Sequence, residues 1–145
     1  MNEVDEQSLA QRVVSAMMAK DAFSQWLGVE VVTVRPNAAT VRMIVRSEMV
    51  NGFGVCHGGI AYSLADSALA FASNTHGRIT MSIENAITYP RTIAIGDELI
   101  ATAEQESATN RLAFFKVTVT RREETMALFR GTVYRTNQDF FPATE

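Results

Sequence analysis

Apolar residues along the chain follow two periods, one typical of helices and one typical of strands. Between Asp5 and Lys20, and again over residues 60–73, they recur every three or four positions and mark one face of a helix. Gly28 is a typical residue at which the first helical region ends. Six other segments are β-branched or alternate between apolar and polar residues, which predicts strands: 29–34, 40–46, 81–89, 98–106, 111–121 and 125–135.

The predicted order of elements favours one particular architecture. Short connections between successive strands imply antiparallel pairing. A long antiparallel sheet buries its apolar face only by wrapping around something, and the central helix is the obvious filling. We therefore predict an α+β protein with the hotdog fold, in which a curved sheet wraps one helix. The 145 residues form one predicted domain, with an N-terminal helical segment over 1–22 and a flexible tail over 136–145.

The central helix has two distinct faces. The broad apolar face packs against the sheet and consists of Ile60, Ala61, Leu64, Ala65, Ala68, Leu69, Phe71 and Ala72. The second face carries Tyr62, Ser63, Asp66, Ala70 and Ser73, and Asp66 is its only charge. An exposed helix face normally carries several long charged residues. This face therefore indicates packing against another chain, with Asp66 at or near the subunit interface rather than at a helix cap or in free solvent.

The stretch NGFGVCHGGIAYSLAD (51–66) places glycines directly before this helix. If the helix begins near His57 or Gly58, its first N–H groups have no partner within the helix and are suited to an oxyanion. Gly58 and Gly59 have no side chain, so a substrate can approach these amides closely. Spacing alone equally allows that the two glycines serve only a tight turn.

Composition and motifs exclude several classes of function. A net charge of -3 gives no indication of a nucleic-acid partner, and no apolar run is long enough for a membrane span. The N-terminus has no signal-peptide pattern, and the single cysteine fits a cytoplasmic protein without a disulfide framework. The spacing of Cys56, His57 and His76 is poor for a metal site, and Cys56 is a weak candidate nucleophile. We expect no metal and no cofactor.

Several motifs together resemble one known family. They are N-G-F-G-V-C-H-G-G-x-x-x-x-L-A-D-S (51–67), M-S-I-E-N-A-I-T-Y (81–89), G-D-E-L (96–99) and A-L-F-R-G (127–131). Over residues 22–135 the chain resembles the PaaI-type hotdog acyl-CoA thioesterases, which are associated with phenylacetate degradation. The resemblance implies active sites shared between two subunits of a homodimer, with dimers commonly pairing into homotetramers.

The resemblance also implies roles for particular residues. Asp66 is the expected catalytic carboxylate, and Gly58 is expected to offer its amide to the thioester carbonyl. The other expected catalytic positions are Asn51 at the thioester from the facing subunit, His57 supporting the loop, and Ser82 orienting the attacking water. Whether Asp66 activates water or attacks the thioester itself stays open.

Substrate contacts are expected from Gly59, from Arg111, and from an aromatic slot that Phe53 and Tyr62 form across the dimer. Two motifs depart from the family pattern: Pro90-Arg91-Thr92 stands before the G-D turn, and T-N-R-L-A-F (109–114) displaces Arg111 by one position. A-L-F-R-G favours aryl-acetyl-CoA thioesters, such as phenylacetyl-CoA or its ring-hydroxylated forms, as substrates. The alternatives are a non-catalytic acyl-CoA-binding module and a hotdog hydratase.

Overall fold

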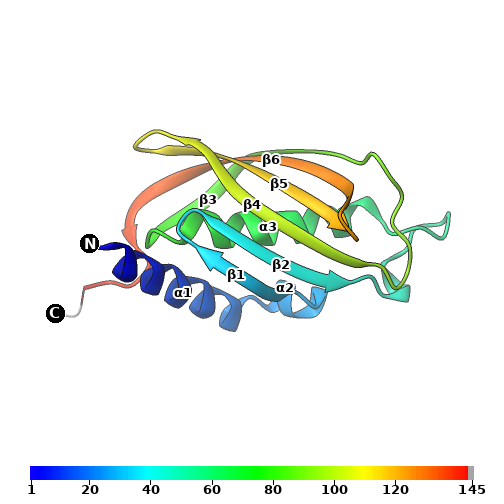
Figure 1. Ribbon diagram of the computed structural model, residues 1–145, viewed down its shortest axis with the longest axis horizontal. Helices are drawn as coiled ribbons and strands as arrows, with labels where there is room; N and C mark the ends of the chain where they lie inside the picture. Colours follow the sequence, from blue (N-terminus) through cyan, green and yellow to red (C-terminus); the bar gives the residue numbers. More distant parts are fainter. Residues whose placement is uncertain (144–145) are drawn as a thin grey trace.

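The computed structural model describes residues 1–143 (Figure 1). Two helices and two strands precede a single-turn 3-10 helix and a long central helix, and four strands follow. The elements are α1 (Glu3–Lys20), α2 (Ala22–Leu27), β1 (Glu30–Arg35), β2 (Ala38–Ile44), η1 (Ser47–Met49), α3 (Gly58–Asn74), β3 (Arg78–Thr88), β4 (Glu98–Ala108), β5 (Leu112–Arg121) and β6 (Glu124–Asp139).

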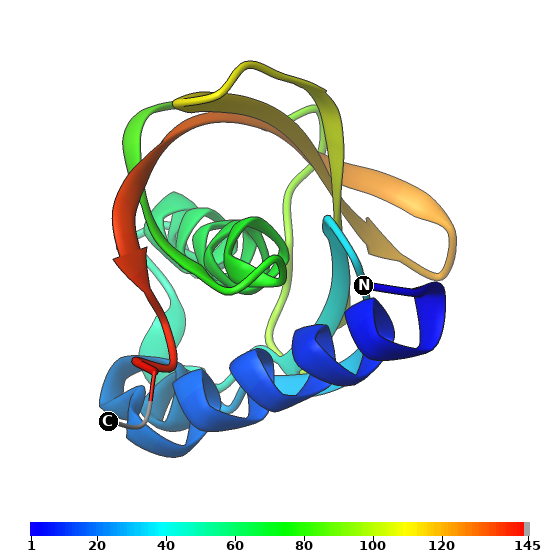
Figure 2. The same ribbon diagram turned by 90° about the vertical axis from the view of Figure 1, so that its left-hand side faces the viewer.

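All six strands form one antiparallel sheet in the order β1-β2-β4-β5-β6-β3. Figure 2 looks toward one end of α3 and shows the sheet curving around this helix. The prediction of an α+β hotdog fold is therefore confirmed. One pairing differs from that expected of successive strands, because β3 lies beside β6 and not beside β4, the next strand along the chain. The connection over 89–97 carries the chain from the β3 edge to the centre of the sheet, so β3 keeps one edge unpaired.

The core lies between α3 and the concave face of the sheet. Leu64, Leu69 and Phe71 of the helix are fully buried, as are Phe115 and Phe129 of the sheet. Burying such side chains contributes about 1.5–3 kcal/mol each, which makes this seam a major source of stability. The second face of α3 is partly accessible at four of its five positions, Tyr62, Ser63, Asp66 and Ala70, so it is open to the predicted packing against another chain. Ser73 is buried instead, and its hydroxyl donates to the Ala70 carbonyl.

The N-terminal segment forms two helices. Asn2 and Asp5 form a reciprocal capping box that begins α1, which then lies across the open side of the curved sheet (Figure 2). Helix α1 ends at Lys20. The carboxylate of the next residue, Asp21, accepts a hydrogen bond from the Ser24 amide and caps the start of α2. Gly28 ends α2 in the left-handed conformation (φ 85°), where the sequence predicts a helix end.

The prediction of a flexible tail over 136–145 is wrong for the residues that the structure describes. Strand β6 continues to Asp139, and the Phe140 amide then donates to the Gly77 carbonyl at 2.7 Å. The Arg12 guanidinium lies 4.8 Å from the centre of the Phe141 ring, which fixes the chain against α1. Residues 144–145 lie outside the described part of the chain. Within residues 1–143, no helix has the length and apolar character needed to cross a membrane.

Candidate active site

Asp66 lies in the middle of α3, half-buried on the face turned away from the core. Burial raises the pKa of its carboxyl group, and a hydrogen bond from Asn85 opposes that rise. A carboxylate in such a setting is more basic than one in water, which suits proton abstraction or nucleophilic attack. The predicted catalytic carboxylate therefore has an environment that distinguishes it from a solvated surface aspartate.

Asn85 of β3 is a neighbour of Asp66 that the sequence analysis did not identify as a site residue. Its Nδ2 amide donates to Asp66 Oδ1 at 3.3 Å and to the Tyr62 hydroxyl at 3.0 Å. The signal in the sequence was a polar residue within the series Met81, Ile83, Asn85 and Ile87, where the alternation otherwise provides apolar side chains.

A bulge in β3 changes the predicted facing of its residues. Ser82 pairs with Val133 and Asn85 pairs with Gly131, because the register shifts between Ser82 and Glu84. Simple alternation would place Ser82 and Asn85 on opposite faces, but the bulge puts both on the helix-facing side. Ser82 makes no hydrogen bond to Asp66 within residues 1–143, so the structure brings it onto the right face without joining it to the carboxylate.

His57 caps the beginning of α3. Its Nδ1 accepts from the Gly59 amide at 2.9 Å, and its own amide donates to the Met49 carbonyl at 2.8 Å. The Gly59 N–H is therefore used inside the protein and is not free to bind a substrate carbonyl, while contact between Gly59 and substrate stays a prediction. Within residues 1–143 no acceptor takes the Gly58 N–H, which remains directed outward from the first turn of the helix.

The two glycines at the start of α3 have a packing explanation that differs from both predicted ones. Neither has a positive φ, so no turn requires them. A Cβ on Gly58 would lie 3.1 Å from the Tyr89 ring, whose hydroxyl donates to the Gly58 carbonyl at 2.7 Å. A Cβ on Gly59 would lie 3.0 Å from the His57 ring. The glycines thus admit these two rings beside the helix terminus, and Tyr89 is a second neighbour that the sequence analysis missed.

The loop before α3 is ordered by Asn51. Its side-chain Oδ1 accepts hydrogen bonds from the backbone amides of Phe53 and Val55. Its backbone N–H donates to the Val55 carbonyl at 2.8 Å. Phe53 at the tip is 92% exposed, so within one chain it lines no slot with Tyr62. Tyr62 instead packs edge-on against Phe129, with ring centroids 5.4 Å apart.

Arg111 lies at the other end of α3, near the start of β3. Its guanidinium donates to Asn137 Oδ1 and to the Arg135 carbonyl, which also accepts from Arg78. Within residues 1–143 none of these three arginines forms an ion pair with a carboxylate. The structure thus groups Arg111 with other cations, at a distance from the Gly58 amide.

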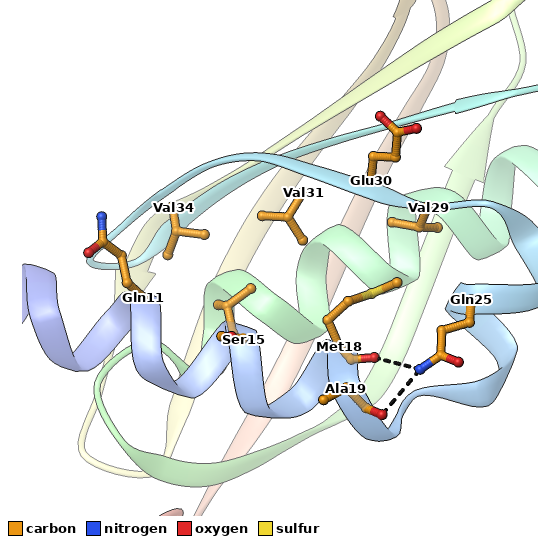
Figure 3. Close-up of a pocket in the computed structure, with 10 residues that line it drawn as sticks. Gln11, Ser15, Met18, Ala19, Gln25, Val29, Glu30, Val31 and Val34 are labelled. Carbon is orange, nitrogen blue, oxygen red and sulfur yellow. Dashed lines mark hydrogen bonds between the residues drawn. The ribbon is translucent and has the colours of Figure 1, made fainter.

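Two cavities differ in size and in the residues that line them. A cavity of about 250 Å³ is lined by His57, Gly58, Tyr89 and Arg91, among others, and gives access to the start of α3. A larger one, of about 540 Å³, lies between α1 and β1 and is lined by Val31, Val34 and Met18 (Figure 3). The larger hollow contains none of the predicted site residues, so we assign the site to the smaller cavity and the face of α3 that carries Asp66.

Other chemistries find little support among the described residues. Burial raises the pKa of the Cys56 thiol to about 11, so it stays protonated and is a poor nucleophile at neutral pH. Within residues 1–143, no three His, Cys, Asp or Glu side chains form a group that could hold a metal ion. Asp66 is therefore the side chain best placed for chemistry on this face.

Comparison with known proteins gives a consistent result. A family model described as Thioesterase superfamily matches residues 53–128. The acyl-coenzyme A thioesterase PaaI of Escherichia coli is 35% identical over 83% of this chain and 86% of its own. The solved structure of Escherichia coli PaaI, from the phenylacetic acid degradation operon, superposes with a TM-score of 0.89 over 92% of this chain and 97% of that one, at 31% identity.

A solved structure from Thermus thermophilus, the TT0310 protein, gives a TM-score of 0.78 at 37% identity over 81% of this chain and 99% of that one. The family model and these relatives agree with the observed fold. The chain therefore belongs to the thioesterase superfamily, as a PaaI-type hotdog acyl-CoA thioesterase.

Proposed function

We propose that this protein hydrolyses aryl-acetyl-CoA thioesters to the free acid and CoA, in active sites that two subunits share. One observation carries the shared site. The unused Gly58 N–H and the Asp66 carboxylate lie on one helix, eight residues apart. That spacing separates them by about 12 Å along the helix axis. An oxyanion donor and a catalytic carboxylate must both lie about 3 Å from the reacting groups, so one chain cannot supply both to one thioester.

A second copy of the chain can supply the carboxylate that lies too far from Gly58 within one chain. Around a twofold axis, α3 of one subunit can run antiparallel to α3 of its partner, which sets each Asp66 opposite the other chain's Gly58. The unpaired edge of β3 supports such pairing, because Met81 and Ile83 there are 57% and 60% exposed. A long strand edge with exposed apolar residues presents unpaired N–H and C=O groups with which a strand of another chain can pair. We extend the proposal to a homodimer, with a homotetramer as the further assembly.

The chemical step requires only groups of this chain and water. The thioester carbonyl binds at the start of α3, where the Gly58 N–H and the helix dipole stabilise the developing oxyanion. Asp66 of the other subunit either takes a proton from the attacking water or attacks the carbonyl carbon to form a mixed anhydride that water then hydrolyses. In both routes the C–S bond breaks and CoA leaves as the thiol.

Other residues have supporting roles in this proposal. Asn51 holds the loop and contacts the thioester from the facing subunit. His57 holds the first turn, and Ser82 lies on the face of β3 from which it can orient water. Arg111, together with Arg78 and Arg135, provides positive charge without carboxylate partners for the phosphates of CoA. The single cysteine, Cys56, is a free thiol in the structure, which supports a cytoplasmic location.

The aryl-acetyl group is supported by two observations. Tyr62 lies one helical turn before Asp66, and Phe53 extends fully exposed from the loop, available to a partner subunit. Across a dimer these rings would give a flat apolar slot. The structural relative from Escherichia coli comes from the phenylacetic acid degradation operon. An aliphatic chain would fill such a slot less completely and bind its transition state less tightly.

Thiol release from a panel of acyl-CoA esters tests this proposal. We expect kcat/KM for phenylacetyl-CoA or a hydroxyphenylacetyl-CoA to exceed that for hexanoyl-CoA, by about 10-fold to 200-fold. Equal or faster hydrolysis of hexanoyl-CoA would reject the aryl preference and leave the thioesterase assignment intact. Tight binding of the esters without thiol release would instead favour the acyl-CoA-binding module.

A further inference from the structure

We infer that Asn85 is a positioning residue, which holds the Asp66 carboxylate and the Tyr62 hydroxyl in fixed orientation at the reacting face of α3. The inference rests on the proposed function, since it concerns the carboxylate of that site. It adds a second residue of β3, besides Ser82, to a site that the sequence otherwise assigned mainly to the central helix and its preceding loop.

The hydrogen bonds of Asn85 point in one direction. Its Nδ2 carries two hydrogens, and the structure gives them two acceptors, Asp66 Oδ1 at 3.3 Å and the Tyr62 hydroxyl oxygen at 3.0 Å. Asp66 and Tyr62 are four residues apart, so they lie one above the other on the same helix face. One side chain of the sheet thus links two functional groups of the helix.

The other end of the Asn85 amide has no polar partner. Its Oδ1 is buried and accepts no hydrogen bond from the described residues. An unsatisfied buried carbonyl oxygen destabilises a folded protein, and an apolar side chain of similar size would avoid that loss. Asn85 stands in a strand whose neighbouring inward position is Ile87, so an apolar residue would fit the pattern. We conclude that the asparagine serves its Nδ2 contacts rather than packing.

Gly131 of β6 leaves the space that Asn85 occupies. The two residues are directly paired across the strands, and a Cβ on Gly131 would lie 2.8 Å from Asn85 Oδ1 and 2.5 Å from the Leu69 side chain. No ordinary side chain fits there. Rotating the amide by 180° would set its oxygen against the Asp66 carboxylate and bury the NH2 group without acceptors. The site therefore admits one orientation of Asn85.

The bulge in β3 places Asn85 on the same face of the sheet as Ser82. Without the register shift between Ser82 and Glu84, one of Ser82 and Asn85 would face away from the helix. With it, both lie on the side of the sheet that faces α3. The hydrogen bond from Asn85 favours the ionised form of Asp66 and counteracts the effect of burial on its pKa.

Three variants test the role of Asn85. Asn85→Ala removes the donor, Asn85→Asp keeps the shape and replaces the donor by an acid, and Glu84→Gln changes the exposed neighbour on the other face as a matched control. For Asn85→Ala we expect kcat to fall about 10-fold to 100-fold with little change in KM, as for a misplaced catalytic group. The acid limb of the pH–rate profile should move to higher pH, and further in Asn85→Asp, because a second carboxylate disfavours ionisation of the first. Glu84→Gln should match the wild type.

A second measurement does not depend on turnover. The infrared carboxyl band of Asp66, identified by its loss in Asp66→Asn, gives its titration midpoint directly. An upward shift of this midpoint in Asn85→Ala or, where that variant does not fold, in Asn85→Asp supports the inference, even if no thioester is hydrolysed and the proposed function fails. An unmoved midpoint and an unmoved acid limb, with only a lower melting temperature, would show that Asn85 is structural and overturn the inference.

Discussion

The two ends of α3 differ in how fully their polar groups are hydrogen-bonded, although each end carries one of the two histidines of the chain. At the C-terminal end, the Asn74 side chain donates to the carbonyls of Ala70 and Thr80 and accepts from the Thr80 amide. The Thr75 hydroxyl donates to the Ala72 carbonyl and accepts from the Asn37 amide. These buried bonds tie the helix to two strand regions.

At the N-terminal end the same helix leaves a donor unused. His57 satisfies the Gly59 amide, Tyr89 satisfies the Gly58 carbonyl, and the Gly58 N–H keeps no partner among the described residues. The N-terminal end of α3 is therefore the end suited to bind a ligand, because the free Gly58 N–H beside the cavity is available to an oxyanion. Substitutions at the N-terminal end of α3 should therefore alter activity, whereas substitutions at the C-terminal end should alter stability.

Asp66→Asn should have the largest effect. The substitution keeps the shape of the side chain and removes the charge that acts as base or nucleophile. We expect kcat to fall about 10²-fold to 10⁴-fold while fold and assembly persist, measured by thiol release, circular dichroism and light scattering. Activity within threefold of the wild type would remove Asp66 from the mechanism.

Gly58→Pro should have the next largest effect, and Gly58→Ala is its matched control. Proline is well tolerated as the first residue of a helix, and His57 already has the extended conformation (φ -61°, ψ 135°) that precedes proline. Both variants add a Cβ near Tyr89, but only proline removes the N–H. We expect kcat of Gly58→Pro to lie about 10²-fold to 10³-fold below that of Gly58→Ala. Equal rates for the two variants would show that this amide does not stabilise the oxyanion.

His76, just after the C-terminal end of α3, should affect the stability of the protein at acidic pH and leave its activity unchanged. Burial, followed by the charges of Arg135 and Arg78, lowers the pKa of His76 to about 4 from 6.5. Between these pH values only the unfolded chain takes up the proton, so stability should fall as pH decreases, by up to about 1.4 kcal/mol per pH unit. Urea unfolding of His76→Gln should show a weaker pH dependence, with wild-type kcat at neutral pH. An unchanged pH dependence would exclude His76 as its source.

Asp66→Asn should also raise stability slightly at neutral pH. Because burial raises the pKa of Asp66 in the folded state, the ionised carboxylate disfavours folding above that pKa. The variant removes this effect, so its melting temperature at neutral pH should exceed that of the wild type. The gain should vanish below pH 3.8, where the carboxyl group is protonated in both states. A lower melting temperature for the variant at pH 7 would contradict this interpretation.

Periodicity was sufficient to predict most of the fold and part of the site. The apolar faces of α3 and the strands are local patterns, and the isolated Asp66 contrasts with its small neighbours. The facing of Ser82 could not be predicted because it depends on a bulge in the pairing of β3 with β6 rather than on local sequence. Asn85 was missed because its contact with Asp66 joins residues 19 positions apart. Tyr89 was missed for a similar reason, since its contact with Gly58 joins residues 31 positions apart. The prediction of a flexible tail failed because Phe140 contacts Gly77 and Phe141 contacts Arg12, which are even more distant along the chain.

Subunit complementation tests whether each active site combines Gly58 of one chain with Asp66 of another. Gly58→Pro and Asp66→Asn chains with different affinity tags are co-expressed, and the hybrid dimer is isolated through both tags. A twofold hybrid contains one complete site and one doubly defective site, so its kcat per dimer should be about half that of the wild type. Both parent homodimers should be nearly inactive. A hybrid no more active than its parents would show that each site lies within one chain, which would contradict the account.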